Sequence, residues 1–171
     1  GIPLGVLSAV KRGSIWDYLG RFVALLGQAV PQFWLGLVLI MVFAVKWQLF
    51  PAGLKGDGFL DVKHLVLPTI TLASGGFAFY MRITRTAMLE VLDSEYVRLA
   101  RAKGVGNNKV IWKHAFKNAL IQPLTGMTLG LTFFLTGSVL VEQIFAWPGM
   151  GLMAIDAINS NDFPVLQGVV F

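Results

Sequence analysis

Few side chains in this 171-residue sequence are suited to catalysis or metal binding. The two histidines, His64 and His114, stand alone, without an HExxH pattern or carboxylates at ligand spacing, and the sequence has no cysteine. No GxxxxGK[ST] pattern occurs, so we do not expect the chain to bind ATP through a P-loop. We therefore predict no catalytic residue, no metal site and no cofactor within this chain.

Three acidic residues in segment 142–162 are the other candidates for ligand binding. Glu142, Asp156 and Asp162 carry all the charge of this segment. They are suited to binding a cationic substrate or to meeting a periplasmic binding protein, but a solvated acidic loop that only fixes the topology explains them as well. Trp147-Pro148-Gly149 in the same segment indicates a turn, and the apolar spacing after it predicts a short helix at the outer surface.

The elements that position these residues are predicted from where charges are missing. The composition is 56% hydrophobic and 13% charged, about half the charge of an ordinary soluble domain. Runs 22–45 and 118–141 hold 24 uncharged residues each, and run 65–81 holds 17. Helices of these lengths cover about 25 to 36 Å, which matches a hydrocarbon core of roughly 30 Å. Each run is therefore predicted to be a transmembrane helix.

The two ends of the sequence are apolar but shorter. Residues 1–10 and 163–171 cannot span a bilayer, and no signal-peptide pattern begins the sequence. We expect two truncated helices there, and thus an internal fragment with three complete transmembrane helices. The fold class that follows is all-α, a polytopic membrane helix bundle forming a single domain over 1–171.

The basic residues set the orientation. Loops 11–21 and 82–117 together hold eleven Lys and Arg, whereas loops 46–64 and 142–162 hold three. The positive-inside rule places the eleven-residue side in the cytoplasm of a multi-pass membrane protein. The net charge of +5 is then a topology signal, and we expect the lipid bilayer, and not nucleic acid, as a partner.

Three polar residues inside the predicted spans are candidates for lining a pathway. Gln28 and Gln32 flank Pro31, and Ser74 precedes a Gly-Gly pair. Polar groups in lipid must face other helices or a cavity. Packing around a proline kink and close helix approach explain them as well as substrate contact does. Gly126 and Gly130 show GxxxG spacing, which indicates helix packing.

Segment 90–117 carries helix-capping residues and helical periodicity that a simple connecting loop does not need. Asp93 or Ser94 can cap a helix over 95–103, and Gly104 is expected to end it. One face carries apolar residues at helical spacing and another carries arginines. Asn107 or Asn108 can cap a second helix that leads into the membrane. A short, basic, amphipathic helix of this kind is either a lipid-surface helix or a docking element for a cytoplasmic partner.

A resemblance to a known family favours docking. The sequence EYVRLARAKGVGNNKVIWKHAFKNALIQP (95–123) resembles the EAA loop of binding-protein-dependent ABC importer permeases. It is most similar to the version in the dipeptide/oligopeptide/nickel branch, which carries a basic residue where Arg98 stands and where many importers have glutamate. Segments 1–18 and 141–158 resemble the B-type subunit of dipeptide permeases. The matching residues are Glu95, Tyr96, Arg98, Ala100, Arg101, Ala102, Lys103, Gly104, His114, Ala115, Asn118, Ala119 and Pro123.

The resemblance implies that loop 90–117 is the cytoplasmic coupling loop, which docks in a cleft of a separate ATP-binding subunit. Tyr96, Leu99 and Ala102 would enter the cleft, the basic residues Arg98, Arg101 and Lys103 would pair with acidic groups, and Gly104 would permit the turn. ATP and Mg would be held by the partner subunits.

The same resemblance implies the assembly: a second homologous permease, two ATP-binding subunits, and a periplasmic or lipid-anchored solute-binding protein in a bacterial or archaeal inner membrane. The implied function is ATP-driven import of di- or oligopeptides, with nickel or glutathione as alternative solutes. A secondary transporter is the alternative class, and the lack of a charged residue within the predicted spans disfavours it.

Overall fold

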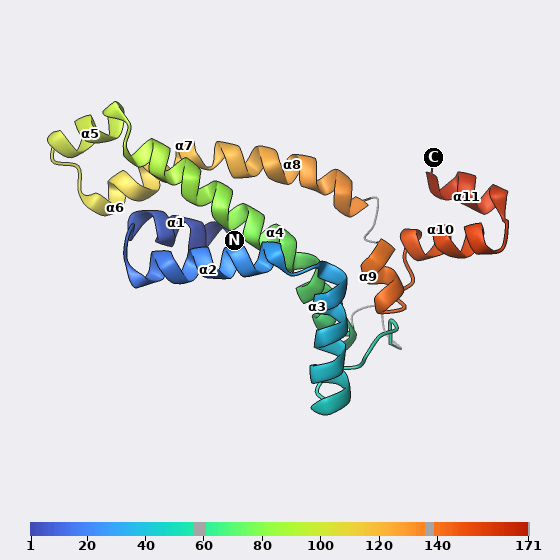
Figure 1. Ribbon diagram of the computed structural model, residues 1–171. Helices are drawn as coiled ribbons and strands as arrows, with labels where there is room; N and C mark the ends of the chain where they lie inside the picture. The colour runs from blue at the N-terminus through green and yellow to red at the C-terminus, as the bar shows by residue number, and fades with distance from the viewer. Residues whose placement is uncertain (57–60, 136–138, 171) are drawn as a thin grey trace. The chain divides into compact units, whose positions relative to one another are not determined.

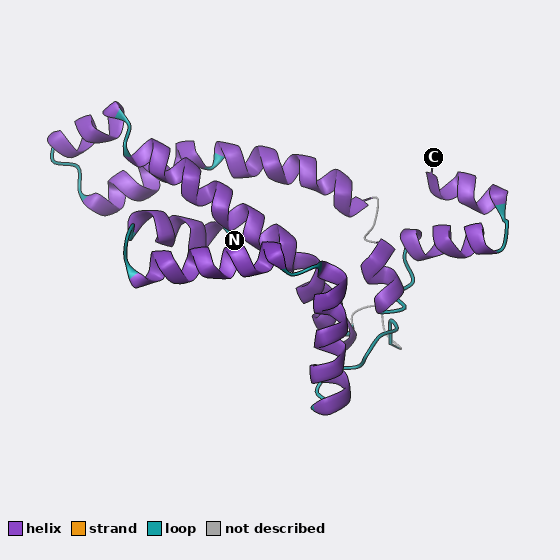
Figure 2. Ribbon diagram, in the orientation of Figure 1, coloured by secondary structure: helices purple, strands orange, loops and turns teal. Residues whose placement is uncertain are grey.

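The computed structural model describes residues 1–56, 61–135 and 139–170, and every regular element within these ranges is helical (Figure 2). The all-α fold class is therefore confirmed. The elements, labelled in Figure 1, are α1 (Ile2–Val10), α2 (Ile15–Ala29), α3 (Gln32–Leu39), the π-helix η1 (Ile40–Lys46), α4 (Val62–Leu92), α5 (Glu95–Ala102), α6 (Asn107–Lys109), the π-helix η2 (Val110–Phe116), α7 (Lys117–Ala119), α8 (Ile121–Leu135), α9 (Val139–Ile144), α10 (Met150–Asn159) and α11 (Phe163–Val170).

The chain forms two compact units. The first unit contains residues 1–29 and 75–130, and the second contains residues 30–74 and 131–171. The long helix α4 contributes its N-terminal part to the second unit and its C-terminal part to the first.

The first unit is built on an antiparallel hairpin of α1 and α2, which turns at Gly13 with a positive φ of 76° (Figure 1). α1 lies so close to α4 that a Cβ on Gly5 would come within 2.6 Å of the Met81 carbonyl oxygen. An apolar cluster, called here the alanine cluster, joins α1, α4, η2 and α7. Its buried members are Val6, Ala9, Ala87, Met88, Ile111, Ala115 and Ala119.

α8 also packs on α4 in the first unit, through the glycines that the sequence singled out. The Tyr80 hydroxyl donates a hydrogen bond to the Gly126 carbonyl at 3.2 Å. A Cβ on Gly130 would lie 2.8 Å from the Tyr80 hydroxyl oxygen. The predicted packing role of Gly126 and Gly130 is thus confirmed, since both lack a side chain where Tyr80 approaches.

The second unit has a core of Leu39, Leu67, Val141 and Phe145. The Phe145 side chain is fully buried, and its carbonyl accepts a hydrogen bond from the Leu54 N–H at 2.8 Å. This bond anchors the irregular segment after η1 against the helices.

The three predicted membrane helices are found only in part. α4 is long and apolar enough to cross a bilayer and includes the predicted span 65–81. The interrupted segment 15–46, made of α2 followed by α3 and η1, is long enough only if both of its parts are counted as one span. The predicted continuous helix 22–45 is wrong, because the chain breaks before Pro31, which is extended (ψ 135°) as the N-cap of α3. Proline disfavours the helical conformation in the residue before it and supplies no N–H, so a break replaces the expected kink.

The third predicted span, 118–141, lies partly outside the described residues. Its described parts are the end of α7, the fifteen-residue helix α8 and the start of α9. Both apolar ends are helical as expected, as α1 and α11. The turn at 147–149 followed by a short helix is confirmed by α10.

Candidate functional site

The predicted amphipathic helix is present as α5, and it ends in a Schellman turn at Gly104. Gly104 has a φ of +77°. The Val105 N–H donates to the Ala100 carbonyl at 3.2 Å, and the Gly104 N–H donates to the Arg101 carbonyl at 2.9 Å. A Cβ on Gly104 would meet nothing within 4 Å. The turn therefore requires glycine for its left-handed backbone and not for space.

The start of α5 agrees with one of the two caps proposed from the sequence. Ser94 is the N-cap residue, but its hydroxyl donates to the Val91 carbonyl instead of capping a helix N–H. The following helix begins differently from the prediction, because Gly106, and neither Asn107 nor Asn108, is the N-cap of α6. Glycine is also accepted at N-caps, so the asparagines are left inside the first turn.

α5 rests on η2 through its inner face, where Val97 and Ala100 are buried. A polar contact reinforces this packing. The Asn118 Nδ2 donates to the Tyr96 hydroxyl oxygen at 2.8 Å and to the His114 carbonyl oxygen at 3.1 Å. The two halves of the loop motif, 95–104 and 114–123, are thus held together by side chains that both belong to the motif.

The outer face of α5 is exposed, although the Tyr96 hydroxyl at its edge is hydrogen-bonded to Asn118. Tyr96 is 43% exposed and Leu99 is 55% exposed, and Ala102 beside them is exposed too. Exposed apolar side chains on a short helix are suited to burial against another surface. These are the three residues that the resemblance assigns to the partner cleft.

The basic residues of α5 surround this face. Arg98 forms an ion pair with Glu95 at 2.9 Å, and both side chains are exposed. Across the described ranges, Arg101 and Lys103 form no ion pair. Exposed guanidinium and ammonium groups at the C-terminal end of a helix can pair with acidic groups of another protein at little desolvation cost.

An ion pair that the sequence analysis missed holds the first unit together. Arg85 of α4 binds the Asp17 carboxylate of α2 through two bonds, Nε to Oδ1 at 2.8 Å and Nη2 to Oδ2 at 3.1 Å. The Ser8 hydroxyl donates to Oδ1 at 2.6 Å and the Gly13 N–H donates to Oδ2 at 3.0 Å. Asp17 is 1% exposed. Its one available signal was that it is the only acidic residue of the basic loop 11–21.

The proposed pathway residues are all hydrogen-bonded within their own units. Gln28 accepts from Arg82 Nη1 at 3.1 Å in the first unit. In the second, Gln32 Nε2 donates to the Leu72 carbonyl at 3.5 Å, and the Ser74 hydroxyl donates to the Thr71 carbonyl at 2.8 Å. The contact of Gln32 joins α3 to α4 and supports the packing interpretation, the bond of Ser74 stays within α4, and Gln28 borders a cavity considered below.

Two of the three acidic residues of segment 142–162 cap helices. Glu142 Oε2 accepts the Leu152 N–H at 2.8 Å, which satisfies a free donor in the first turn of α10. A Cβ on Gly149 would lie 2.4 Å from the Glu142 carboxyl carbon, so a side chain at this position would displace the Glu142 carboxylate. Asp162 Oδ1 accepts the Val165 N–H at 3.2 Å at the start of α11.

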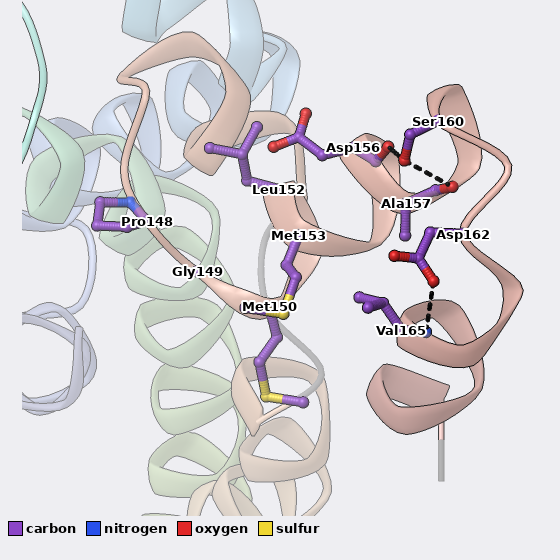
Figure 3. Close-up of a pocket in the computed structure, with 10 residues that line it drawn as sticks. All are labelled: Pro148, Gly149, Met150, Leu152, Met153, Asp156, Ala157, Ser160, Asp162 and Val165. Atoms are coloured by element: carbon purple, nitrogen blue, oxygen red, sulfur yellow. Dashed lines mark hydrogen bonds between the residues drawn. The ribbon is translucent and has the colours of Figure 1, made fainter.

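Asp156 borders a cavity of about 560 Å³ in the second unit (Figure 3). Met150 and Met153 also line this cavity, together with Asp162. Carboxylates beside flexible thioethers suit a cationic or apolar peptide group, but the capping role of Asp162 already explains one of the two carboxylates. The cavity therefore does not decide whether the acidic residues of segment 142–162 bind a ligand.

The described residues contain no group of three or more potential metal-ligating side chains. His64 pairs with Asp61 at 2.9 Å within the second unit, a carboxylate contact that the sequence analysis did not anticipate. His114 contributes its carbonyl oxygen to the Tyr96 contact. Among the described residues, neither histidine is joined by the further ligands that a zinc site needs.

The described residues thus combine an all-helical body, in which α4 is long and apolar enough to cross a membrane, with an exposed basic helix that carries apolar side chains and ends at a glycine. All of residues 1–171 match the family described as binding-protein-dependent transport system inner membrane component, and the chain belongs to this family. The resemblance proposed from the loop sequence is thereby confirmed.

Several similar proteins carry peptide permease names. The chain is 42% identical to the dipeptide transport system permease protein DppB of Escherichia coli (strain K12), over 99% of this chain and 58% of that protein. It is 42% identical to the oligopeptide transport system permease protein AppB of Bacillus subtilis (strain 168), over 98% of this chain and 55% of that protein. The chain is also 42% identical to the di/tripeptide transport system permease protein DppB of Pseudomonas aeruginosa (strain UCBPP-PA14), over 98% of this chain and 57% of that protein. The chain thus spans a little over half the length of these relatives.

Proposed function

We propose that this chain is part of the permease subunit of an ATP-driven ABC importer that moves di- or oligopeptides across a bacterial or archaeal inner membrane. The family of the chain and the peptide permease names of its relatives support this proposal. These names favour peptides over nickel or glutathione as the solute.

The proposed assembly contains a second, homologous permease subunit, two ATP-binding subunits that hold ATP and Mg, and a solute-binding protein outside the membrane. The observation that carries the proposal is the geometry of α5. Its apolar and basic face is exposed, while its opposite face is fixed on η2. A helix held in this way can enter a cleft of an ATP-binding subunit without rearranging the permease.

The mechanism follows from how α5 is joined to the rest of the first unit. When two ATP-binding subunits close on ATP, the coupling helices docked in them are displaced. α5 follows α4 after only Asp93 and Ser94, and η2 joins it to the alanine cluster. The displacement therefore reaches the membrane helices as a rigid-body motion, which alternates access to the solute.

Loop 82–117, with eight basic residues, is proposed to face the cytoplasm, and the chain is proposed to cross the membrane several times. The positive-inside rule supports this orientation. A test is to introduce a single cysteine into the full-length protein, either at exposed position 109 (Lys109→Cys) or at exposed position 156 (Asp156→Cys), and to add a thiol-reactive reagent to intact cells. We expect labelling by a membrane-impermeant reagent at position 156 only; labelling of position 109 would contradict the orientation.

The test of the function is Gly104→Val in the full-length permease, assembled with its partner subunits. Valine at a φ of +77° costs at least about 1–2 kcal/mol, because its Cβ crowds the following carbonyl. That cost corresponds to roughly a 5- to 30-fold loss of the correct turn. We expect peptide uptake per ATP hydrolysed to fall by at least about fivefold.

Two control variants separate backbone strain from side-chain bulk. Gly104→Asn supplies a residue that tolerates the left-handed region and should retain uptake. Gly106→Val places the same side chain two positions away, where φ is −57° and a Cβ would meet nothing within 4 Å. Full uptake by Gly104→Val would refute the role of the turn, and uptake that continues without ATP hydrolysis would instead support a secondary transporter.

A further inference from the structure

A second charged feature of the first unit has no part in docking α5. A cavity of about 240 Å³ opens between α2 and the C-terminal part of α4. Three arginines, Arg21, Arg82 and Arg85, contribute to its lining, together with Gln28. The lining also includes apolar side chains such as Leu25 and Met81.

The arginines of this cavity are only partly neutralised. Arg85 is bound by both oxygens of Asp17, whereas Arg21 reaches the same carboxylate only at 3.5 Å. Arg82 is exposed, and its Nη1 donates to the neutral oxygen of Gln28. Three guanidinium groups against one carboxylate leave a net charge of +2 beside the cavity. Each guanidinium has five N–H donors, so Arg21 and Arg82 retain donors for an oxyanion.

The position of the cavity along the chain indicates where the oxyanion comes from. Arg21 immediately precedes the uncharged run 22–45, and Arg82 immediately follows the uncharged run 65–81. Both arginines therefore lie at the end of an apolar segment, where lipid headgroups meet water. On the same helix as Arg21, the apolar residues Phe22 and Leu25 are 59% and 65% exposed.

We propose that this cavity binds the phosphate of an anionic phospholipid, with the acyl chains against the exposed apolar side chains of α2. Arginine forks match phosphate oxygens in geometry and charge. Basic pockets beside membrane helices are suited to anionic headgroups. The carboxylate of a peptide would fit the arginines equally well, but a soluble ion makes no use of the exposed apolar residues that adjoin them.

The proposal rests on the chain lying in a bilayer and not on the solute that the transporter moves. It is tested on the full-length permease purified in detergent with its partner subunits. Phosphatidylglycerol and phosphatidylcholine with identical acyl chains are added in competition, and the lipids retained are counted by native mass spectrometry. We expect the wild-type complex to retain phosphatidylglycerol about thirtyfold better than phosphatidylcholine, which corresponds to two surface charges in contact with the headgroup.

Four variants identify the cavity. Arg21→Gln with Arg82→Gln removes two charges and is expected to abolish the preference, while Arg21→Lys with Arg82→Lys keeps the charges and should keep most of it. Lys109→Gln with Lys113→Gln makes the same change of charge on exposed residues of α6 and η2 and should have no effect. Arg82→Gln alone leaves the Asp17–Arg85 pair intact, so a partial loss is measurable even if the double variant fails to assemble.

Equal retention of the two lipids by the wild type would overturn the proposal, as would an unchanged preference in Arg82→Gln. Inorganic phosphate and a dipeptide are added in separate arms. Displacement of phosphatidylglycerol by a dipeptide at the concentrations that are transported would assign the arginines to the solute and overturn the lipid assignment. Resistance to both soluble anions supports it.

Discussion

Replacing Asp17 with asparagine removes the carboxylate that neutralises Arg85 inside the first unit. The carboxylate accepts hydrogen bonds from Arg85 at both oxygens, from Ser8 at one and from the Gly13 N–H at the other. Asparagine keeps a single acceptor oxygen, and its NH₂ group would face donors. At least two of the four hydrogen bonds are therefore lost, and the arginine charge remains without a counter-charge.

The expected cost follows from burial. Removing one partner of a buried ion pair destabilises a protein by about 3–5 kcal/mol. The Asp17 side chain is 1% exposed and the Arg85 side chain is 19% exposed. Water can therefore recover part of the solvation of Arg85, and we expect the low end, about 3 kcal/mol. For a domain of this size, that corresponds to a fall in Tm of roughly 6–12 °C.

The assay is thermal unfolding of the full-length permease in detergent, followed by tryptophan fluorescence. Asp93→Asn is the matched control, because it breaks the Arg12–Asp93 pair at 3.7 Å, in which both side chains are about two-thirds exposed. This control should cost no more than about 1 kcal/mol. Asp17→Asn combined with Arg85→Met removes both charges and should recover part of the loss. A fall in Tm no larger for Asp17→Asn than for Asp93→Asn would refute the reasoning.

Three further perturbations follow from the contacts described. Tyr96→Phe removes the hydroxyl that accepts a hydrogen bond from Asn118, so we expect the free energy of unfolding to fall by about 1 kcal/mol and amide exchange in α5 to become faster. Combining Tyr96→Phe with Asn118→Ala should add little to this loss, and additive losses would contradict the contact. Gly5→Ala places a methyl group 2.6 Å from the Met81 carbonyl oxygen, a backbone atom that cannot rotate away, so α1 should separate from α4 and Tm should fall. Gly168→Ala is the control, because its methyl group would meet nothing within 4 Å and should leave Tm unchanged. Glu142→Ala removes the acceptor of the Leu152 N–H and should cost about 1 kcal/mol, measured as increased exchange of that amide; Glu142→Gln keeps an acceptor oxygen and should show a smaller increase.

The sequence predicted the helix α5 and its end at Gly104 better than it predicted the membrane helices, for physical reasons. The helix α5 and its C-terminal end are determined by the local sequence, since the N-cap residue, the amphipathic pattern and Gly104 lie within about ten residues of one another. The break before Pro31 could not be distinguished from a kink, because tertiary packing decides how far a proline-containing helix bends. The Asp17–Arg85 pair joins residues 68 positions apart, and no periodicity signals a contact at such separation. The sequence left the role of Glu142 open between ligand binding and a solvated charge, because its contact with the Leu152 N–H depends on the fold of the turn that follows it.

The alanine cluster has a mechanical consequence. Four of its seven buried residues are alanines, whose side chains have no rotamers to change and hold neighbouring helices at short separation. A force applied at α5 is therefore not dissipated by side-chain rearrangement in this layer and is passed to α1 and α4 as displacement. An enlarging substitution such as Ala115→Leu would separate the helices and add compliance to the bundle. Under the proposed function, the displacement of the membrane helices would then be smaller than the displacement of α5, even if the affinity of α5 for the proposed ATP-binding subunit were unaltered.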